Sequence, residues 1–366
     1  MKYDVLVVGA GLAGCVSANI LATKYNKKVL VLEQKEHIGG NCYDYKNDQD
    51  ILIHKYGPHL FHTSNTKVWE FLSQFTQWQP YEHKVLAHID GKNVPIPFNF
   101  NTIEMLFESK FAQGLQKKLL KKYQLGTKVP ILQLKADSDQ ELQFLADYIY
   151  EKLFLNYTAK QWGLKPEELD SAVTARVPVY IGRDNRYFND TYQAVPQDGY
   201  TQLITNLLDH PNIEVKLSTP FVFEKNRQQQ IIYTGMIDAL FAYKFGTLPY
   251  RSVTMQFETH PQKFYQEAST INFPNEHAFT RITEFKHIHP SLSEATTILK
   301  EFPQAYKKDE NLPYYPIFTD ANQKLFQKYD DYAKQFPNIT LLGRLAEYKY
   351  YDMDDIVERV LEHFKL

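Results

Sequence analysis

The chain has 366 residues, which at about 100 to 200 residues per domain predicts about two or three structural units. It carries 41 Lys and Arg residues against 43 Asp and Glu residues, a net charge of −2, and so lacks the global positive field that nucleic acid or anionic lipid would require. Its two cysteines, Cys15 and Cys42, exclude a disulfide framework, a four-cysteine zinc site and a CxxC pair, so we expect a protein of the reducing cytoplasm.

The segment from Val5 to Thr23 carries no charged residue and is as long as a membrane span. Glycines and polar residues interrupt it, and Lys2 is the only basic residue before it. A strand-like run then follows directly. We therefore expect neither a signal peptide nor a membrane span.

The same segment matches the dinucleotide-binding fingerprint. A strand is predicted over residues 2–8, a helix extends to Leu21, and a second strand over 29–32 ends in Glu33. The turn between strand and helix carries the GxGxxG glycines, which are Gly9, Gly11 and Gly14. The first permits the turn, the second lets backbone approach a pyrophosphate, and the third lets the helix pack on the sheet. The helix start favours phosphate, and Glu33 is placed to accept hydrogen bonds from a ribose.

Later segments are predicted to complete this domain. A Gly-Gly turn follows Glu33 at residues 39–41 and would bring further backbone N–H groups to the cofactor. More strands and a closing helix are predicted within 214–222, 230–241, 339–344 and 354–363. The cofactor domain is therefore predicted to be discontinuous.

The remaining chain has two other patterns. Helical spacing covers 102–123 and 138–154, the second with a capping box of Ser138 and Glu141. Alternating runs typical of antiparallel strands cover 174–181, 252–257 and 278–285. We expect an α/β fold with three domains. They are a Rossmann-like cofactor domain (1–83, 198–240 and 336–366), a small helical domain (98–165) and an antiparallel-sheet substrate domain (84–97, 166–197 and 241–335).

A single bound dinucleotide is expected. No second GxGxxG follows Gly14, which argues against a reductase that binds a flavin and a nicotinamide in separate Rossmann units. The Gly-Gly turn and the C-terminal strand ending in Gly343 and Arg344 can both contact one tightly held cofactor. We therefore predict that the Rossmann-like domain binds FAD rather than NAD.

Six further motifs occur in order along the chain. They are GPHLFHT (57–63), NYTAKQWG (156–163), RVPV (176–179), TRITEFKH (280–287), PYYP (313–316) and GRLAEYKYYDMD (343–354). From the first strand to the last helix, the chain resembles bacterial UDP-galactopyranose mutase. Six ordered motifs are far more specific than the glycine fingerprint alone.

The resemblance implies an FAD enzyme that interconverts UDP-galactopyranose and UDP-galactofuranose without net redox change. Members of this family work with reduced flavin, whose N5 forms a covalent adduct with the anomeric carbon of the sugar as UDP leaves. The cofactor performs the difficult step, and the protein binds and orients. This accounts for the lack of an obvious nucleophile and base pair in the sequence.

The resemblance also implies catalytic and substrate-binding residues. The catalytic set is His62, beside the isoalloxazine, with Arg176 and Arg281 on the pyrophosphate, where a guanidinium makes bidentate contacts. Arg251 is a lesser companion of these arginines. The other substrate-binding residues are Tyr157, Trp162, Tyr187, Tyr315, Tyr350, Asp352 and His83.

The implied cofactor-binding set extends the glycine turn. With Gly9, Gly11, Gly14 and Glu33 it contains Leu12, Ala13, Gly40, Asn41, His59, Thr234, Gly235, Gly343, Arg344, Tyr350, Asp352 and Met353. His59 and His62 lie three apart, but no HExxH or cysteine cluster completes a zinc site, so no metal is expected.

The sequence departs from the family pattern at two positions. Tyr180 stands where many members carry a second arginine, so one positive charge is missing from that loop. His83 stands where a sugar-side asparagine is common. The second departure bears on relative substrate preference more than on the type of reaction.

Two other classes of function stay open: a flavin oxidase or desaturase of the amine oxidase type, and a non-catalytic module that binds UDP or flavin. The set of arginines distinguishes a mutase from an oxidase, because an oxidase of a neutral or cationic substrate does not need these arginines. The resemblance implies a UDP-sugar partner, a transient reductant such as NAD(P)H or reduced flavin, a homodimer, and galactofuranose supply for surface glycans. The loop between Gly163 and Asn189 is predicted to move over the substrate.

Overall fold

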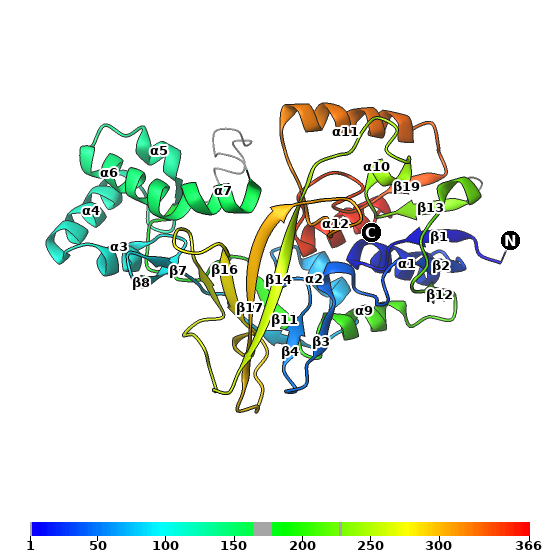
Figure 1. The fold of residues 1–366 in the computed structure, drawn as a ribbon, viewed down its shortest axis with the longest axis horizontal. Helices are drawn as coiled ribbons and strands as arrows, with labels where there is room; N and C mark the ends of the chain where they lie inside the picture. Colours follow the sequence, from blue (N-terminus) through cyan, green and yellow to red (C-terminus); the bar gives the residue numbers. More distant parts are fainter. Residues whose placement is uncertain (1, 164–177, 227–228) are drawn as a thin grey trace. The chain divides into compact units, whose positions relative to one another are not determined.

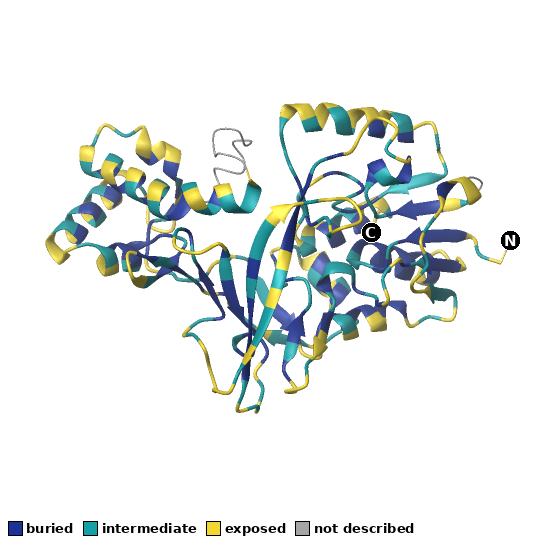
Figure 2. Ribbon diagram, viewed as in Figure 1, coloured by how far each residue is buried: buried dark blue, intermediate teal, exposed yellow. Residues whose placement is uncertain are grey.

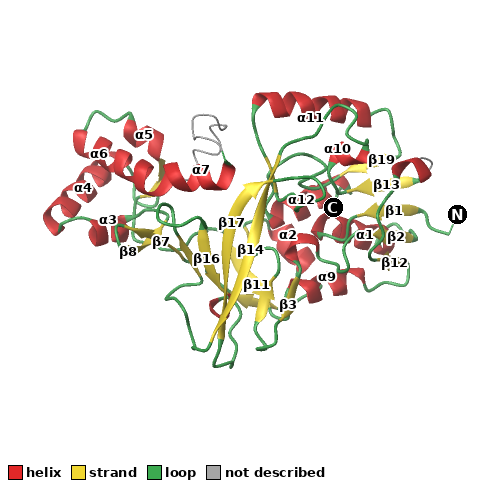
Figure 3. Cartoon of the chain, in the orientation of Figure 1, coloured by secondary structure: helices red, strands yellow, loops and turns green. Residues whose placement is uncertain are grey.

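The structure is a computed structural model that describes residues 2–163, 178–226 and 229–366. Residue contacts divide the chain into two units, each built from segments distant in sequence (Figures 1 and 3). The first unit contains Met1–Tyr81, Asp190–Tyr250 and Pro313–Leu366, and the second contains Glu82–Asn189 and Arg251–Leu312.

The first unit is organised around a parallel sheet of order β12-β2-β1-β13-β19 (Figure 1). Its central strands are short runs of Val, Leu and Ile, as is typical of parallel strands buried on both faces. Val5 lies opposite Val29 on one side and Gln230 on the other. The strands are β12 (Ile213–Lys216), β2 (Val29–Leu32), β1 (Val5–Val8), β13 (Gln230–Tyr233) and β19 (Ile339–Leu341).

Helix α1 (Leu12–Thr23) packs against this sheet and against α9 (Tyr200–Leu208) and α12 (Met353–His363). Most of its residues are buried, which explains the absence of charge from this segment. Its amide side chain at Asn19 donates to the carbonyl oxygen of Leu207 at 2.8 Å, so the polar interruption is satisfied inside the core. In the part of the chain that the structure describes, no helix is long and apolar enough to cross a membrane.

The segment predicted as strands over 230–241 forms a strand only in its first part. This strand ends at Tyr233, and a single helical turn, α10 (Ile237–Leu240), follows Thr234 and Gly235. The buried carboxylate of Asp238 accepts the N–H groups of Ala239 and Leu248, at 3.0 and 2.8 Å, and thereby fixes this turn. The strand end expected near Thr234 and Gly235 agrees with the end of β13. Strand structure beyond Gly235 was wrongly predicted, because the contact of the Asp238 side chain with a distant backbone group favours the turn.

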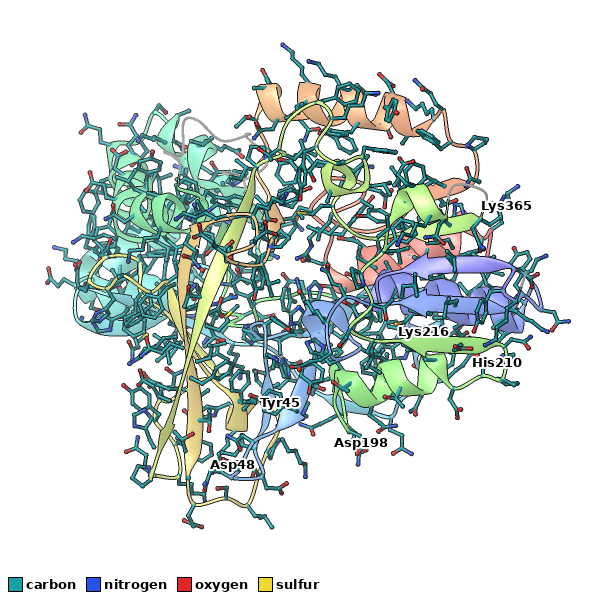
Figure 4. The ribbon with its side chains drawn as sticks, turned by 45° about the vertical axis from the view of Figure 1, so that its right-hand side comes forward. Tyr45, Asp48, Asp198, His210, Lys216 and Lys365 are labelled. Atoms are coloured by element: carbon teal, nitrogen blue, oxygen red, sulfur yellow. The ribbon has the colours of Figure 1, made fainter. Side chains whose placement is uncertain are left out.

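Two small antiparallel sheets extend the first unit. One has the order β5-β11-β6 and the other is the hairpin β3-β4. Asp44 on β3 accepts the N–H groups of Tyr200 and Thr201 at 2.6 and 2.8 Å and so caps α9, whose own N-cap is Gly199. Figure 4 shows Tyr45 and Asp48 on this hairpin, with Asp198 and His210 flanking α9. The strands are β3 (Asp44–Lys46), β4 (Leu52–His54), β5 (Phe61–Thr63), β6 (Trp78–Pro80) and β11 (Tyr192–Pro196).

The remaining elements of the first unit are short segments and surface helices. They are η1 (Gly40–Cys42), α2 (Thr66–Leu72), η4 (Phe223–Lys225), β18 (Tyr315–Pro316) and α11 (Asp320–Ala333). The closing helix predicted over 354–363 is confirmed by α12, which starts one residue earlier.

The second unit contains a sheet with the strand order β14-β17-β16-β15-β7-β8. All its neighbouring pairs are antiparallel except β15 and β7, so the prediction of an antiparallel sheet holds for most of it. The strands are β7 (Val85–Ile89), β8 (Lys92–Ile96), β14 (Tyr250–His260), β15 (Thr270–Asn272), β16 (Arg281–Glu284) and β17 (Thr296–Ala305), with the turn η5 (Phe285–His287) after β16.

Helices and a two-stranded sheet complete the second unit. The helix predicted over 102–123 is two helices, α3 and α4, because Phe107 adopts an extended conformation between them. Figure 2 shows their buried residues along one side of each helix, as amphipathic spacing predicts. The elements are α3 (Phe100–Leu106), α4 (Ser109–Lys122), β9 (Lys128–Pro130), α5 (Ile131–Lys135), α6 (Gln140–Ile149), η2 (Tyr150–Leu155), α7 (Asn156–Trp162) and β10 (Pro178–Tyr180).

The cap of α6 differs from the predicted capping box. Asp139, not Ser138, is the N-cap, and its carboxylate accepts the N–H groups of Glu141 and Leu142 at 2.9 and 3.4 Å. Aspartate and serine are both favourable N-cap residues, so the sequence pattern alone did not show which of the adjacent Ser138 and Asp139 caps the helix.

The observed units also group the chain differently from the three predicted domains. The helices and the sheet predicted as separate domains fall into one unit, and residues 190–197, 241–250 and 313–335 join the cofactor unit. The predicted discontinuity of the cofactor domain agrees with this grouping.

Candidate cofactor and substrate sites

Three glycines shape the turn between β1 and α1. A Cβ on Gly9 would lie 2.1 Å from Oγ1 of Thr234, and a Cβ on Gly14 would lie 2.0 Å from the carbonyl oxygen of Gly9. Gly11 is the N-cap of α1, and no described side chain caps this helix. The free N–H groups at Leu12 and the residues after it therefore form a site that suits an anion such as a pyrophosphate.

A second glycine segment faces the first. Gly40 has φ +57°, and a Cβ on it would lie 2.8 Å from Cα of Gly11. Gly343 has φ +106°, and a Cβ there would lie 3.3 Å from Cβ of Ala13. Thr234, which Gly235 follows directly, donates to the carbonyl oxygen of Val8 at 2.8 Å. These predicted cofactor residues therefore converge on one backbone cradle, whose shape fits a dinucleotide.

Glu33 lies buried at the end of β2. Its carboxylate accepts the N–H groups of Ala10 and Lys35, each at 2.8 Å, and a carboxylate has about four lone-pair sites, so it can still accept from a ribose. Nζ of Lys35 lies 4.2 Å from the centre of the Tyr56 ring and 3.5 Å from Oδ1 of Asn41, and burial lowers the pKa of this lysine. Sequence reasoning missed Lys35, although a cation beside the fingerprint acid was a visible signal.

Arg344, Tyr315 and Tyr350 form one cluster. The two tyrosine rings stack with centroids 5.7 Å apart, and the guanidinium carbon lies 5.5 and 5.3 Å from their centroids. Nε of Arg344 also donates to the carbonyl oxygen of Tyr351 at 3.1 Å. The structure thus brings together predicted residues from two motifs.

Asp352 and Met353 begin α12. Asp352 is its N-cap in a capping box with Asp355, whose carboxylate accepts the N–H of Asp352 at 2.8 Å. The sulfur of Met353 lies 3.7 Å from Sγ of Cys42. Both residues therefore have structural contacts, and their contacts with cofactor or substrate stay predictions.

The two histidines of the GPHLFHT motif have different partners. His59 donates from Nδ1 to the carbonyl oxygen of Gly57 at 2.9 Å. The backbone N–H of His59 donates to Nδ1 of His54 at 3.0 Å. Nδ1 of His62 lies 3.1 Å from Oδ2 of Asp190. Among residues 2–163, 178–226 and 229–366, no three His, Cys, Asp or Glu side chains are grouped to hold a metal ion.

The second unit contains a cavity of about 350 Å³. The predicted substrate residues Tyr157 and Tyr187 line it, together with apolar side chains such as Leu153 and Phe154. Asn272 also lines the cavity and is 9% exposed. Its Oδ1 has no hydrogen-bond partner among the described residues. A mostly apolar cavity with one unsatisfied acceptor suits a flat heteroaromatic ring that carries an N–H.

Arg281, at the start of β16, lies opposite Asn272 on one side and Glu301 of β17 on the other. Directly opposed residues of neighbouring strands share one face of a sheet. Nε and a terminal nitrogen of Arg281 lie 2.6 and 2.9 Å from the two carboxylate oxygens of the buried Glu301. The row Asn272, Arg281 and Glu301 therefore joins the cavity to an oriented guanidinium. The other predicted pyrophosphate arginine, Arg176, lies outside the described residues.

Sequence reasoning missed Asn272, Glu301 and Asp190. The residues that flank them in the sequence form no motif. Each acquires a candidate role only through a strand partner or a cavity that the fold creates. The strand that follows the strand of Arg281 could have been searched for an acidic residue able to make a bidentate contact with this arginine.

Arg251 has a structural contact that the sequence did not predict. It is buried, and it donates to the carbonyl oxygens of Gln161 and Lys160 at 2.8 and 3.0 Å, at the end of α7. Gly163 ends that helix with φ +67°, and a Cβ there would lie 2.6 Å from the Arg251 guanidinium. Arg251 thus holds the segment that carries Trp162, and its phosphate contact stays a prediction.

The two departures from the family pattern lie close to the cavity residues. His83 is buried, accepts the N–H of Tyr187 on its carbonyl oxygen at 2.8 Å, and packs its ring 5.8 Å from the Tyr187 ring. Tyr180 lies on β10, and a Cβ on Gly182 would lie 2.7 Å from its ring. His83 therefore supports Tyr187 and is absent from the cavity lining.

Comparison with known proteins identifies relatives. A sequence model described as UDP-galactopyranose mutase matches residues 152–350, and one described as an NAD(P)-binding Rossmann-like domain matches residues 7–75. The dTDP-fucopyranose mutase of Escherichia coli is 34% identical over 98% of this chain and 96% of its own length. A probable UDP-galactopyranose mutase of Klebsiella pneumoniae is 34% identical over 98% of this chain and 93% of its own length.

Solved structures show the same fold. The crystal structure of a reduced UDP-galactopyranose mutase matches with a TM-score of 0.75 at 14% identity, over 100% of this chain and 94% of that chain. Sequence and fold agree over nearly the whole length. The chain belongs to the UDP-galactopyranose mutase family and is an isomerase with a Rossmann-like dinucleotide-binding domain.

Proposed function

We propose that the protein interconverts UDP-galactopyranose and UDP-galactofuranose with no net redox change. The observation that carries the proposal is the cross-strand row Asn272, Arg281 and Glu301, of which Asn272 lines the second unit's cavity. The cavity offers an acceptor to a base, and the guanidinium beside it offers donors to a diphosphate. The 34% identity to a probable UDP-galactopyranose mutase over 98% of the chain supports the same substrate.

FAD is the proposed cofactor, held by the cradle around Gly11 and Gly40 and by Glu33. When bound and reduced, it supplies a nucleophilic N5 for the anomeric carbon of the sugar. The residues of the chain bind and orient. Backbone N–H groups at the start of α1 receive the pyrophosphate, and the cluster of Arg344, Tyr315 and Tyr350 supplies guanidinium and hydroxyl donors.

The phosphates of the substrate are proposed to bind Arg281, with Arg176 as a second donor. Glu301 holds the guanidinium in a fixed orientation, which lowers the entropy lost when a phosphate binds. We propose further that the protein acts in the cytoplasm as a homodimer, receives electrons from NAD(P)H or a reduced flavin, and supplies galactofuranose to surface glycans.

A second candidate substrate is a dTDP-fucose, because the dTDP-fucopyranose mutase of Escherichia coli is also 34% identical, over 98% of this chain. Thymine and uracil present the same imide N–H to an acceptor such as Asn272, so the cavity's polar group alone does not select between them. The two proposals therefore differ in base and sugar, and share the reaction type.

Chromatography of nucleotide sugars tests the function directly. Purified protein is incubated with UDP-galactofuranose or with dTDP-fucofuranose, once oxidised and once reduced by dithionite. Conversion of UDP-galactofuranose in the reduced sample alone supports the main proposal, and faster conversion of the thymidine sugar favours the second candidate. No conversion of either, with peroxide released from an amine, would instead support a flavin oxidase. Tight UDP binding without any turnover would support a binding module.

Replacing Asn272 by leucine is expected to weaken UDP binding about 5- to 150-fold, which corresponds to about 1 to 3 kcal/mol for a lost buried hydrogen bond. Leucine keeps the branching and the number of heavy atoms of the asparagine side chain and removes the acceptor. Isothermal titration with UDP measures the loss, and inorganic pyrophosphate serves as the matched ligand because it lacks a base. Equal losses for both ligands would contradict a base-binding role of Asn272.

A further inference from the structure

His62 lies on β5 of the first unit, where Gln193 of β11 is its direct cross-strand partner. Its ring nitrogen Nδ1 lies 3.1 Å from Oδ2 of Asp190, the residue two positions before β11 begins. The side chains are 15% and 29% exposed, so the contact is partly shielded from water. The pairing of β5 with β11 therefore delivers a carboxylate to one particular nitrogen of the ring.

Asp190 is itself held in place. Its other carboxylate oxygen, Oδ1, accepts from the hydroxyl of Ser64 at 3.4 Å, and that hydroxyl accepts the N–H of Thr191 at 3.2 Å. The side-chain amide of Gln193 donates to the carbonyl oxygen of Asp190 at 3.0 Å. Both ends of the residue are thus fixed by β5 and β11, and this arrangement resembles a support for the ring more than a chance surface ion pair.

His62 in turn acts on a second carboxylate, that of Asp354. Burial and the neighbouring Asp355 raise the pKa of Asp354, in the first turn of α12, while His62 and the hydroxyl of Thr63 act to lower it. Asp190 is the carboxylate in direct contact with Nδ1 of His62.

This contact determines which tautomer a neutral imidazole ring adopts. A neutral ring has one N–H donor and one acceptor nitrogen, and an ionised carboxylate can only accept. The ring must therefore carry its proton on Nδ1, where it faces Asp190. Nε2 is then the nitrogen that can accept a hydrogen bond or a proton.

We infer that Asp190 is a positioning residue that fixes His62 as the Nδ1–H tautomer and presents Nε2 to the reacting groups. The inference rests on the proposed function and on the place beside the isoalloxazine that the family resemblance implies for His62. It goes beyond both by naming the residue that sets the ring's orientation and proton. The role that it assigns to Asp190 is exerted through His62.

The test is ¹⁵N NMR of histidine side chains in the holoprotein, with the His62→Gln variant to assign the signal. In the parent protein, Nδ1 of His62 is expected to show the shift of a protonated nitrogen and Nε2 that of an unprotonated one. In Asp190→Ala the population is expected to move toward the Nε2–H form. A parent protein with Nε2 protonated, or a tautomer unchanged in Asp190→Ala, would overturn the inference.

Kinetics supply the second readout. Asp190→Ala is expected to lower kcat about 10- to 100-fold while KM changes less than about threefold, as for other residues that orient a functional histidine. Asp198→Ala is the matched control, because Asp198 is an exposed aspartate of the same unit, just before α9 (Figure 4). Equal effects of both variants on kcat would contradict the positioning role.

Two further outcomes keep the result interpretable. If Asp190→Ala fails to fold, Asp190→Asn keeps the shape and loses the obligatory acceptor, and a mixture of tautomers is then expected. If no variant and no parent sample converts a nucleotide sugar, the proposed function fails, while the ring spectra still decide whether Asp190 fixes the tautomer.

Discussion

Replacing Arg281 by alanine is expected to lower kcat/KM for the UDP sugar by about 30- to 5,000-fold while the protein keeps its flavin. This range corresponds to about 2 to 5 kcal/mol, the usual loss on truncating one partner of a shielded charged contact. Arg281 lies directly between Asn272 and Glu301 across three strands, so no other residue of this row can replace its donors. Turnover is measured by chromatography and flavin content by absorbance.

The control for this variant addresses Glu301. Arg281→Ala leaves a carboxylate that is 4% exposed without the guanidinium, and such a charge is expected to cost about 3 to 5 kcal/mol of stability. The double variant Arg281→Ala with Glu301→Ala removes both charges and is expected to unfold at a higher temperature than the single variant. Its turnover is expected to stay low. Recovery of turnover in the double variant would show that the single variant fails through stability alone.

Much of the first unit was predictable because local sequence determines it. The glycines at positions 9 and 14 are demanded by contacts within a few residues or by the strand beside the turn, and β2 occupies the predicted residues. The acid that ends β2 is buried against the turn, as the fingerprint requires. These features depend on spacing along the chain, which a sequence displays directly.

The second unit was less predictable because its site is assembled across strands. Asn272 and Glu301 become neighbours of Arg281 only through the register of three strands, and nothing in the spacing of their residues encodes that register. Arg251 was predicted for phosphate from its residue type, whereas the structure shows it on the carbonyl ends of α7. The residue type predicts which contacts a side chain can make, and the fold determines which partner it contacts.

Replacing Gly11 by alanine is expected to leave the fold intact and to weaken FAD binding at least about tenfold. Gly11 has φ −81°, an ordinary conformation for any residue, and a Cβ there would meet only Cα of Gly40, at 3.7 Å. The free protein therefore accepts a methyl group at this position. If the pyrophosphate approaches the turn as proposed, the methyl group occupies part of its space, and a loss of about 1.4 kcal/mol already gives a tenfold weaker complex.

One neighbouring glycine and one distant glycine make this test specific. Gly14→Ala would place Cβ 2.0 Å from the carbonyl oxygen of Gly9, so it is expected to displace α1 and to lose both stability and flavin. Gly114→Ala, within α4, meets nothing within 4 Å and is expected to add about 0.5 to 1 kcal/mol of stability with normal flavin content. Thermal unfolding of the apoprotein and fluorescence titration with FAD separate these effects. Parental FAD affinity in Gly11→Ala would mean that the pyrophosphate does not approach this turn, since the fold offers no other reason for glycine there.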